Sequence, residues 1–254
     1  MNIVFFLTLD RVGKSILAKL NELNPLDTHV VLHNPSADFF NASIPTSSHI
    51  NVLNVFENSP NWEDLLRLLP NDVVLRGFSW FPFLFPDYFI ARFDEGMLNL
   101  HNSFLPFNRG RHSTFWAIMD RTPFGATIHW VDARIDRGNI VTQKQIILDE
   151  YANASEAYEA QLDICIELAL DFLPSLQSKI DIGISQNDDL ATLHLATDII
   201  EATTVSSKDW VTWGDVVKLI RATSTPKGSI SVVFEDGNRV VISGSVIGVS
   251  RNLN

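Results

Sequence analysis

The stretch Gly96-Met-Leu-Asn-Leu-His-Asn-Ser-Phe-Leu-Pro-Phe-Asn-Arg-Gly110 passes from a short apolar run into a polar loop that contains proline and glycine. The run Gly96–His101 predicts a buried strand, and the residues after it predict an irregular loop. Asn99 and His101 are two residues apart, so an extended chain directs both side chains to one face. The stretch therefore predicts an amide and an imidazole presented together at the carboxyl end of a strand.

Upstream of this stretch, strand patterns alternate with helical patterns. The predicted strands are Ile3–Leu7, Thr28–Leu32, Ile50–Val55 and Asp72–Gly77, and the predicted helices are Gly13–Leu23, Asn61–Leu69 and Pro86–Phe93. Because the strands are apolar throughout, they favour a mostly parallel sheet with helices on both faces. We expect an α/β fold with a doubly wound, Rossmann-like sheet that binds ligands at the carboxyl ends of its strands.

The chain after the polar loop continues this pattern and then changes character. We predict a helix near Ser113–Met119, strands at Gly125–Val131 and Ile140–Ile147, a helix from Asn153 to about Leu176, a polar linker at Lys179–Asp189, a helix opened by Thr212, and a hairpin of Ser229–Phe234 with Arg239–Val246. These elements predict a main domain over residues 1–180 and a small α+β appendage over residues 190–254.

Composition excludes several classes of function. The 254 residues are 46% hydrophobic and 19% charged, as in an ordinary globular protein, and the net charge of −11 disfavours nucleic acid as a partner. Cys165 is the single cysteine, so neither an internal disulfide nor a cysteine-rich metal site is expected, and the histidines show no ligand-like spacing. Charges and prolines interrupt the apolar stretch Asp72–Phe93, so we expect no membrane span and a cytoplasmic location.

Gly13-Lys-Ser15 resembles the end of a phosphate-binding loop, but the match is incomplete. Thr8 stands where that motif needs its first glycine, and Asp10 places negative charge where phosphates would bind. Nucleotide hydrolysis is therefore not expected.

A second turn, Val131–Ile140, carries Asp136 between two predicted strands. Asn99, His101 and Asp136 suit acyl transfer to an amine: an amide N–H stabilises an oxyanion, an imidazole accepts a proton, and a carboxylate stabilises the imidazolium. From the residues alone, however, an isolated Asn-x-His pair is more often structural than catalytic.

Several motifs in order resemble the folate-dependent formyltransferase family. They are Asn99-Leu-His-Asn-Ser-Phe-Leu-Pro106, Arg109-Gly110, Phe115-Trp-Ala-Ile118, Thr122-Pro-Phe-Gly-Ala-Thr-Ile-His-Trp130 and Ile135-Asp-Arg-Gly-Asn-Ile-Val-Thr-Gln143. The resemblance implies that Asn99, His101 and Asp136 are catalytic and that the formyl donor is N10-formyltetrahydrofolate. Two departures stand out: Thr8-Leu-Asp-Arg11 replaces a glycine-containing loop, and Arg137 follows Asp136 where threonine is usual.

The segment Asn108–Trp116 is similar to the sugar N-formyltransferases of this family, which act on amino sugars linked to nucleotides. For the substrate we assign a set of residues rich in arginine, which could pair with a diphosphate: Arg76, Arg109, Gly110, Arg111 and His112. For the folate we assign a mainly aromatic set after a predicted strand, together with Asp132 of the second turn: Phe78, Trp80, Phe83, Leu84 and Asp132. Each arginine could equally be structural, and the aromatic residues could equally form core or a dimer face.

We therefore expect formyl transfer from N10-formyltetrahydrofolate to a dTDP- or GDP-linked amino-deoxysugar, for O-antigen or another surface polysaccharide. The alternatives are a methionyl-tRNA-type formyltransferase, a formyltetrahydrofolate hydrolase, and a catalytically idle folate- or nucleotide-binding module. The small appendage and its β-branched hairpin strand predict a homodimer.

Overall fold

The computed structural model describes residues 1–23, 27–35, 50–149, 152–206, 212–225, 228–233 and 239–243. Two compact units divide the chain. The first unit contains Met1–His101, Ala126–Lys144 and Leu162–Gln186, and the second contains Asn102–Gly125, Gln145–Gln161 and Asn187–Asn254. This division differs from the predicted boundary near residues 180–190, because two internal segments of the chain group with its C-terminal part.

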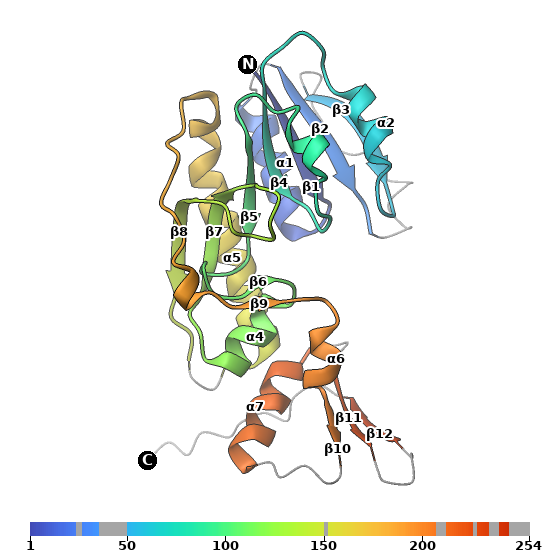
Figure 1. Ribbon diagram of the computed structural model, residues 1–254, viewed down its shortest axis with the longest axis vertical. Helices are drawn as coiled ribbons and strands as arrows, with labels where there is room; N and C mark the ends of the chain where they lie inside the picture. Colours follow the sequence, from blue (N-terminus) through green and yellow to red (C-terminus); the bar gives the residue numbers. More distant parts are fainter. Residues whose placement is uncertain are drawn as a thin grey trace. The chain divides into compact units, whose positions relative to one another are not determined.

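The first unit is built on most of a seven-stranded sheet (Figure 1). Its strand order is β3 (Ile50–Phe56), β2 (Thr28–His33), β1 (Asn2–Thr8), β4 (Leu75–Trp80), β5 (Met97–His101), β7 (Phe124–Trp130) and β8 (Ile140–Ile146). The strands from β3 to β5 pair in parallel, and β7 pairs with β5 antiparallel. The chain direction of the first five strands therefore brings their carboxyl ends to one edge.

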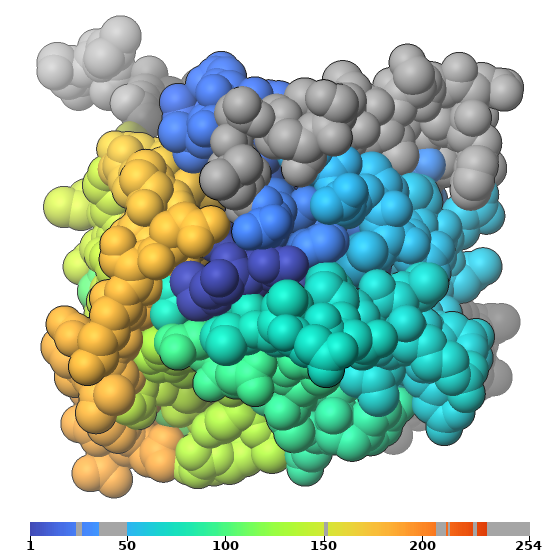
Figure 2. Space-filling model, turned by 90° about the horizontal axis from the view of Figure 1, so that it is seen from above, coloured from blue at the N-terminus to red at the C-terminus, as the bar shows by residue number. Residues whose placement is uncertain are grey.

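Helices cover both faces of this sheet, as the apolar strands predicted. Val4 and Phe6 of β1 join a buried cluster with α2 (Trp62–Leu68) and with residues in and just after α3 (Asp87–Ile90). Strand alternation directs Phe5 to the opposite face, where α1 (Arg11–Leu23) and α5 (Ala154–Phe172) are joined by an ion pair between Arg11 and Asp163. In Figure 2 the first residues of the chain lie at the surface beside the turquoise segment that leads into β4.

The second unit contains shorter elements. Its segments are β6 (Arg109–Gly110), α4 (Ser113–Asp120), β9 (Leu193–His194), α6 (Asp198–Ala202), β10 (Thr204–Ser206), α7 (Trp213–Thr223), β11 (Ser229–Val233) and β12 (Arg239–Ser243). The predicted capping box at Thr212 and Asp215 is present, and β11 and β12 form the predicted hairpin. The hairpin's turn and its residues beyond Ser243 lie outside the described residues.

No helix in the described part of the chain combines the length and the apolar character that crossing a membrane requires.

Candidate active site

The candidate site begins on β5. The side chains of Met97, Asn99 and His101 share one face of this strand, because successive side chains alternate between its two faces. Met97 belongs to the buried cluster that includes residues of α2 and α3. The antiparallel register of β5 with β7 sets Asn99 opposite His129 and His101 opposite Thr127. The predicted shared face of Asn99 and His101 is therefore present, at the carboxyl end of the strand.

Asp136 reaches this cluster from the turn between β7 and β8. Its backbone adopts a φ of +49°, an unusual conformation for a residue that is not glycine. Its Oδ2 lies 3.7 Å from Nδ1 of His101, and its Oδ1 lies 3.5 Å from Nε2 of His129. The carboxylate therefore lies within ion-pair distance of two buried imidazoles, each of which it stabilises when protonated.

His129 is the member of this cluster that the sequence interpretation did not assign. Its Nδ1 lies 2.8 Å from the carbonyl oxygen of Trp130, so the neutral ring carries its hydrogen on Nδ1. Its Nε2, 3.2 Å from the amide nitrogen of Asn99, then accepts a hydrogen bond from that amide. Thr-Ile-His-Trp130 is one of the quoted motifs, but only the strand register shows that its histidine lies opposite Asn99.

Close packing fixes the turn that carries Asp136. A Cβ added at Gly138 would lie 1.8 Å from the carbonyl oxygen of Trp130, so only glycine fits there. The backbone N–H of Trp130 donates to the carbonyl of Asn139 at 2.9 Å, which closes the turn. Asp132, assigned to the folate, pairs with Arg134 at the surface, at 2.8 Å.

The loop after β1 is closed by its own aspartate. The carboxylate of Asp10 accepts from the backbone N–H of Gly13 at 3.0 Å, and so caps the start of α1. Its two oxygens also accept from the indole N–H of Trp80, at 3.0 and 2.9 Å. The carboxylate of Asp10 therefore accepts hydrogen bonds from groups of the protein itself.

The assigned folate residues occupy different environments. Phe78 is a core residue: the β4–β5 register places it beside Leu98, on the face away from Asn99, and its ring packs against Phe5. The structure therefore corrects its assignment as a folate contact. Phe83 packs against His33, whereas Leu84 is 69% exposed. Phe83 and Leu84 follow β4, so they lie on the side of the sheet to which the strands' carboxyl ends point.

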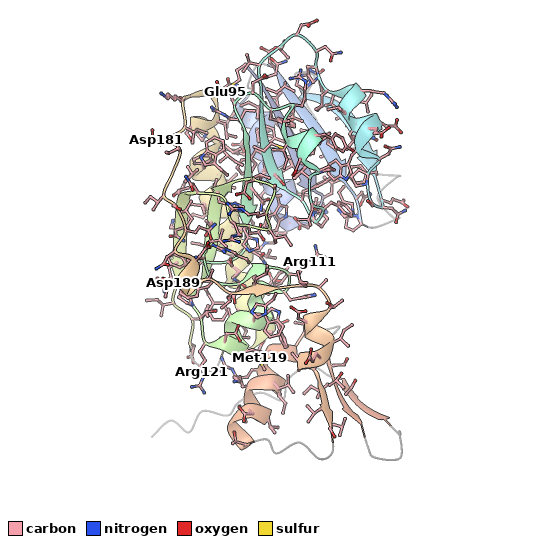
Figure 3. The ribbon with its side chains drawn as sticks, viewed as in Figure 1. Glu95, Arg111, Met119, Arg121, Asp181 and Asp189 are labelled. Carbon is pink, nitrogen blue, oxygen red and sulfur yellow. The ribbon has the colours of Figure 1, made fainter. Side chains whose placement is uncertain are left out.

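Arg76 also has a structural role rather than the predicted substrate contact. The strand predicted at Asp72–Gly77 begins later, at Leu75, so Arg76 lies near the amino end of β4. Its buried guanidinium donates to the carbonyls of Leu176 and Ser178, at 2.5 and 2.6 Å, and pairs with Glu95 at 3.1 Å. Figure 3 labels Glu95 where the chain enters β5, at the opposite end of the strand from His101.

The remaining substrate candidates belong to the second unit. Arg109 is buried, and its guanidinium pairs with Asp188 at 2.9 Å, so its charge already has a carboxylate partner. Gly110 adopts a φ of +91° where β6 pairs with β9. Arg111 and His112 are exposed residues just before α4. Desolvation of the ring by the surrounding protein, and then the positive charge of Arg111, lower the pKa of His112.

No cluster of histidine, cysteine, aspartate or glutamate among the described residues has the arrangement of a metal site. The polar cluster of Asn99, His101, His129 and Asp136 instead has the geometry of proton transfer and oxyanion stabilisation.

Comparison with known proteins gives this cluster its context. Residues 41–164, which contain all four of its members, match the family model for formyl transferase. This stretch of the chain is therefore similar to the formyl transferase family, as its motifs implied.

Among curated proteins, the methionyl-tRNA formyltransferase of Staphylococcus aureus (strain Newman) is 31% identical to the chain over 131 residues. This match spans 51% of the chain and only 42% of that relative.

Two solved structures share the fold. A 4-N formyltransferase from Francisella tularensis has a TM-score of 0.73 at 22% identity, covering 98% of this chain and 99% of that one. An N-formyltransferase from Helicobacter canadensis, in complex with folinic acid and dTDP-3-aminofucose, has a TM-score of 0.69 at 18% identity, covering 91% and 83%. The predicted α/β class, with a mostly parallel, doubly wound sheet, is confirmed.

Proposed function

We propose that this chain transfers the formyl group of N10-formyltetrahydrofolate to the amine of a nucleotide-linked amino sugar. The observation that carries the proposal is the cluster in which Asp136 lies within 3.7 Å of His101 and 3.5 Å of His129, while Asn99 contacts His129. The match to the formyl transferase family model and the near-complete overlap with a 4-N formyltransferase support it.

Each residue of the cluster has a role in this reaction. The bound folate supplies the formyl carbon that the amine attacks. The imidazole of His101 accepts the proton that the amine loses, and the carboxylate of Asp136 stabilises the resulting imidazolium. As the bond between the formyl carbon and N10 breaks, that proton passes to N10, and tetrahydrofolate leaves. The amide of Asn99 donates to the formyl oxygen as negative charge develops there. His129 holds that amide in a fixed orientation by accepting one of its N–H groups.

The residues after β4 suit a folate. Phe83 and Leu84 leave apolar surface exposed on the carboxyl side of the sheet, and a pterin ring would cover it. We retain Phe83, Leu84, Trp80 and Asp132 as proposed folate residues. The folinic acid bound to the Helicobacter enzyme supports this choice of donor.

A sugar nucleotide suits the chain better than transfer RNA does. The net charge of −11 disfavours a polyanionic substrate, although the curated match is to a transfer-RNA enzyme. The dTDP-3-aminofucose in the Helicobacter structure supports an amino sugar linked to dTDP, and GDP remains the second nucleotide that we propose. Arg111 and His112 are the substrate residues we retain, with Gly110 shaping their loop.

The wider setting is also proposed. We infer a cytoplasmic homodimer that acts in O-antigen or other surface polysaccharide synthesis, with catalysis by residues 1–180 and an appendage over residues 190–254. Light scattering at micromolar concentration tests the dimer, because a mass near 28.5 kDa would refute it.

The direct test is a transfer assay with N10-formyltetrahydrofolate and a panel of dTDP-, GDP- and UDP-linked amino sugars. We expect a formamido sugar and tetrahydrofolate in equal amounts from at least one member. Transfer only to methionyl-tRNA would show that the substrate is an aminoacylated transfer RNA and not an amino sugar. Formate release without an acceptor would instead make the chain a hydrolase, and folate binding without turnover would make it an idle binding module.

A further inference from the structure

The segment of residues 178–186, here called the strap, follows the 3-10 turn that ends α5. It covers most of the polar segment Lys179–Asp189 that the sequence predicts as a linker, but in the structure it lies along the turn that carries Asp136 and along β8. Arg76 donates to the carbonyl of Ser178 at the start of the strap. Ile140 and Ile184 exchange two backbone hydrogen bonds of 2.8 Å, and Trp130 donates its indole N–H to the carbonyl of Asp181. The strap is therefore part of the first unit.

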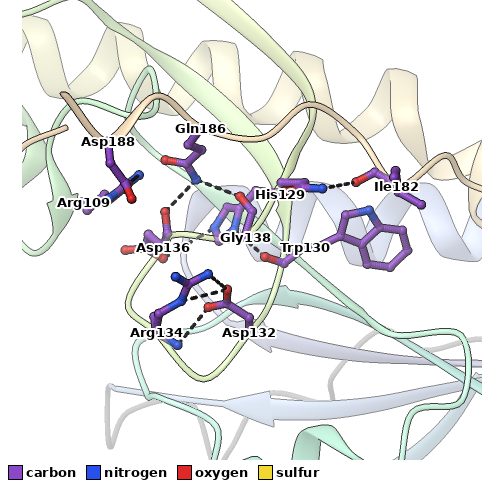
Figure 4. Close-up of polar contacts among 11 residues, drawn as sticks. Arg109, His129, Trp130, Asp132, Arg134, Asp136, Gly138, Ile182, Gln186 and Asp188 are labelled. Atoms are coloured by element: carbon purple, nitrogen blue, oxygen red, sulfur yellow. Dashed lines mark hydrogen bonds and ion pairs between the residues drawn. The ribbon is translucent and has the colours of Figure 1, made fainter. Parts of the chain in front are cut away.

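Gln186 is where the strap meets the proposed catalytic turn. Its side-chain nitrogen Nε2 donates to the carbonyl oxygen of Asp136 and to that of Gly138, both at 2.8 Å (Figure 4). Most strap residues are exposed, whereas Gln186 is half-buried and turned toward the turn. The amide of Gln186 therefore donates to both of the carbonyls that flank Arg137.

This contact answers a requirement of the site. Asp136 adopts a left-handed backbone conformation that is unusual for a residue other than glycine, so surrounding contacts must hold it. Gln186 fixes the carbonyl of the strained residue itself. The direction of the Asp136 carboxylate, toward His101 and His129, depends on that backbone conformation.

We propose that Gln186 is a positioning residue, whose amide holds the Asp136 turn so that the carboxylate faces His101 and His129. The inference rests on the proposed function of Asp136, because it assigns Gln186 a role in the same reaction. The residue lies beyond the stretch that matches the formyl transferase family model, which ends at residue 164. The strap therefore supplies the matched domain with a part of its active site.

The test compares Gln186→Met, which keeps the length of the side chain and removes its donors, with Asn139→Leu. Asn139 donates to the carbonyl of Ile182, so its replacement removes a strap hydrogen bond that does not involve Asp136. Assayed with the same sugar substrate as the wild-type enzyme, Gln186→Met should have a kcat lower on the order of 10- to 100-fold. KM for both substrates should change less than about twofold, since ground-state binding is not altered.

A second measurement needs no activity. At fixed pH, the imidazole NMR signals of His101 and His129 should move in Gln186→Met toward their positions in Asp136→Asn, and should stay in place in Asn139→Leu. Signals that stay in place in Gln186→Met, or an equal loss of kcat in Asn139→Leu, would overturn the positioning role. A wild-type enzyme that transfers no formyl group would refute the proposed function, whereas the NMR comparison would still decide whether Gln186 holds Asp136.

Discussion

The side-chain amide nitrogen of Asn99 lies 3.2 Å from Nε2 of His129, across the antiparallel pairing of β5 with β7. Nδ1 of His129 is committed to the carbonyl of Trp130, so the imidazole holds the amide of Asn99 by accepting from it. A proton on Nε2 would end that acceptance, because a protonated ring nitrogen only donates. The neutral form of His129 is therefore the one that orients the amide of Asn99, the proposed oxyanion donor.

Replacing His129 should accordingly impair turnover rather than binding. We expect a folded His129→Leu variant to lose on the order of 10- to 100-fold in kcat, because the amide of Asn99 is no longer oriented. His129→Gln, whose side-chain oxygen can accept from Asn99, should retain more activity. Steady-state kinetics with circular dichroism as the folding control decide this, and a Leu variant within threefold of wild type would remove His129 from the site.

His101→Asn and Asp136→Asn should fold normally and lose nearly all formyl transfer. Both side chains act on the proton released in the reaction and contribute little to the core. We expect kcat/KM to fall by more than tenfold, which is about 1.4 kcal/mol of transition-state stabilisation. Either variant retaining more than about a tenth of wild-type kcat/KM would disprove the role of that residue.

Gly110→Ala should destabilise the second unit. The residue has a φ of +91°, and a Cβ there would lie 2.2 Å from the carbonyl oxygen of His194. We expect a loss of about 2 kcal/mol from strain and from disruption of the β6–β9 pairing. Gly214→Ala is the matched control, because its nearest neighbour would be 3.5 Å away and alanine favours its helix. The melting temperatures of both variants test this prediction. Equal melting temperatures for Gly110→Ala and Gly214→Ala would contradict it.

Acid should weaken the fold through His33. Burial lowers its pKa below the ordinary value of 6.5, against smaller opposing effects from the carbonyl of Glu57 and from Asp10. Because the unfolded chain binds the proton more readily, the stability due to the neutral ring is present above about pH 6.5 and is lost as the pH falls below it. When the pH is lowered from about 7.5 to about 5.5, the urea concentration at the unfolding midpoint should therefore fall less for His33→Gln than for the wild-type protein. Parallel falls would contradict the prediction.

Cys165 should be inert in the native protein. Its thiol is fully buried, and burial, followed by the negative charge of Asp10, raises its pKa well above the ordinary range. The thiolate that reacts with Ellman's reagent is therefore almost unpopulated near pH 8. We expect no modification of the folded chain and complete reaction in guanidinium chloride. Rapid labelling of the folded protein would show that this region opens readily.

Local patterns in the sequence predicted the sheet and most of the proposed catalytic cluster, because these features depend on residues that are close together in the chain. Apolar runs identified the strands, and the two-residue spacing of Asn99 and His101 placed their side chains on one face. At β4 the exposed Val73 and Val74 extended the apolar run toward the amino end, which placed Arg76 near the end of the predicted strand. The predicted strand began three residues early, and the buried guanidinium was interpreted as a ligand contact.

Long-range pairing explains what the sequence did not predict. His129 enters the site through the antiparallel register of β7 with β5, which no local pattern specifies. Gln186 enters through the segment that the sequence predicted as a linker. In the structure this segment pairs with β8 through the backbone of Ile184, and most of its side chains are exposed. Phe78 was assigned to the folate because its neighbours are aromatic, although strand alternation directs it into the core.

The strap also has a consequence for how this protein is made. The first unit is completed only by residues up to Gln186, after the chain has twice left it to contribute to the second unit and returned. During synthesis on the ribosome, β1 to β5 emerge well before the segments that cover β8 and hold the Asp136 turn. Such non-local closure slows folding and leaves strand edges open for longer. A nascent chain halted before the strap would therefore present an open sheet edge, and this is the stage at which we expect chaperones to bind it.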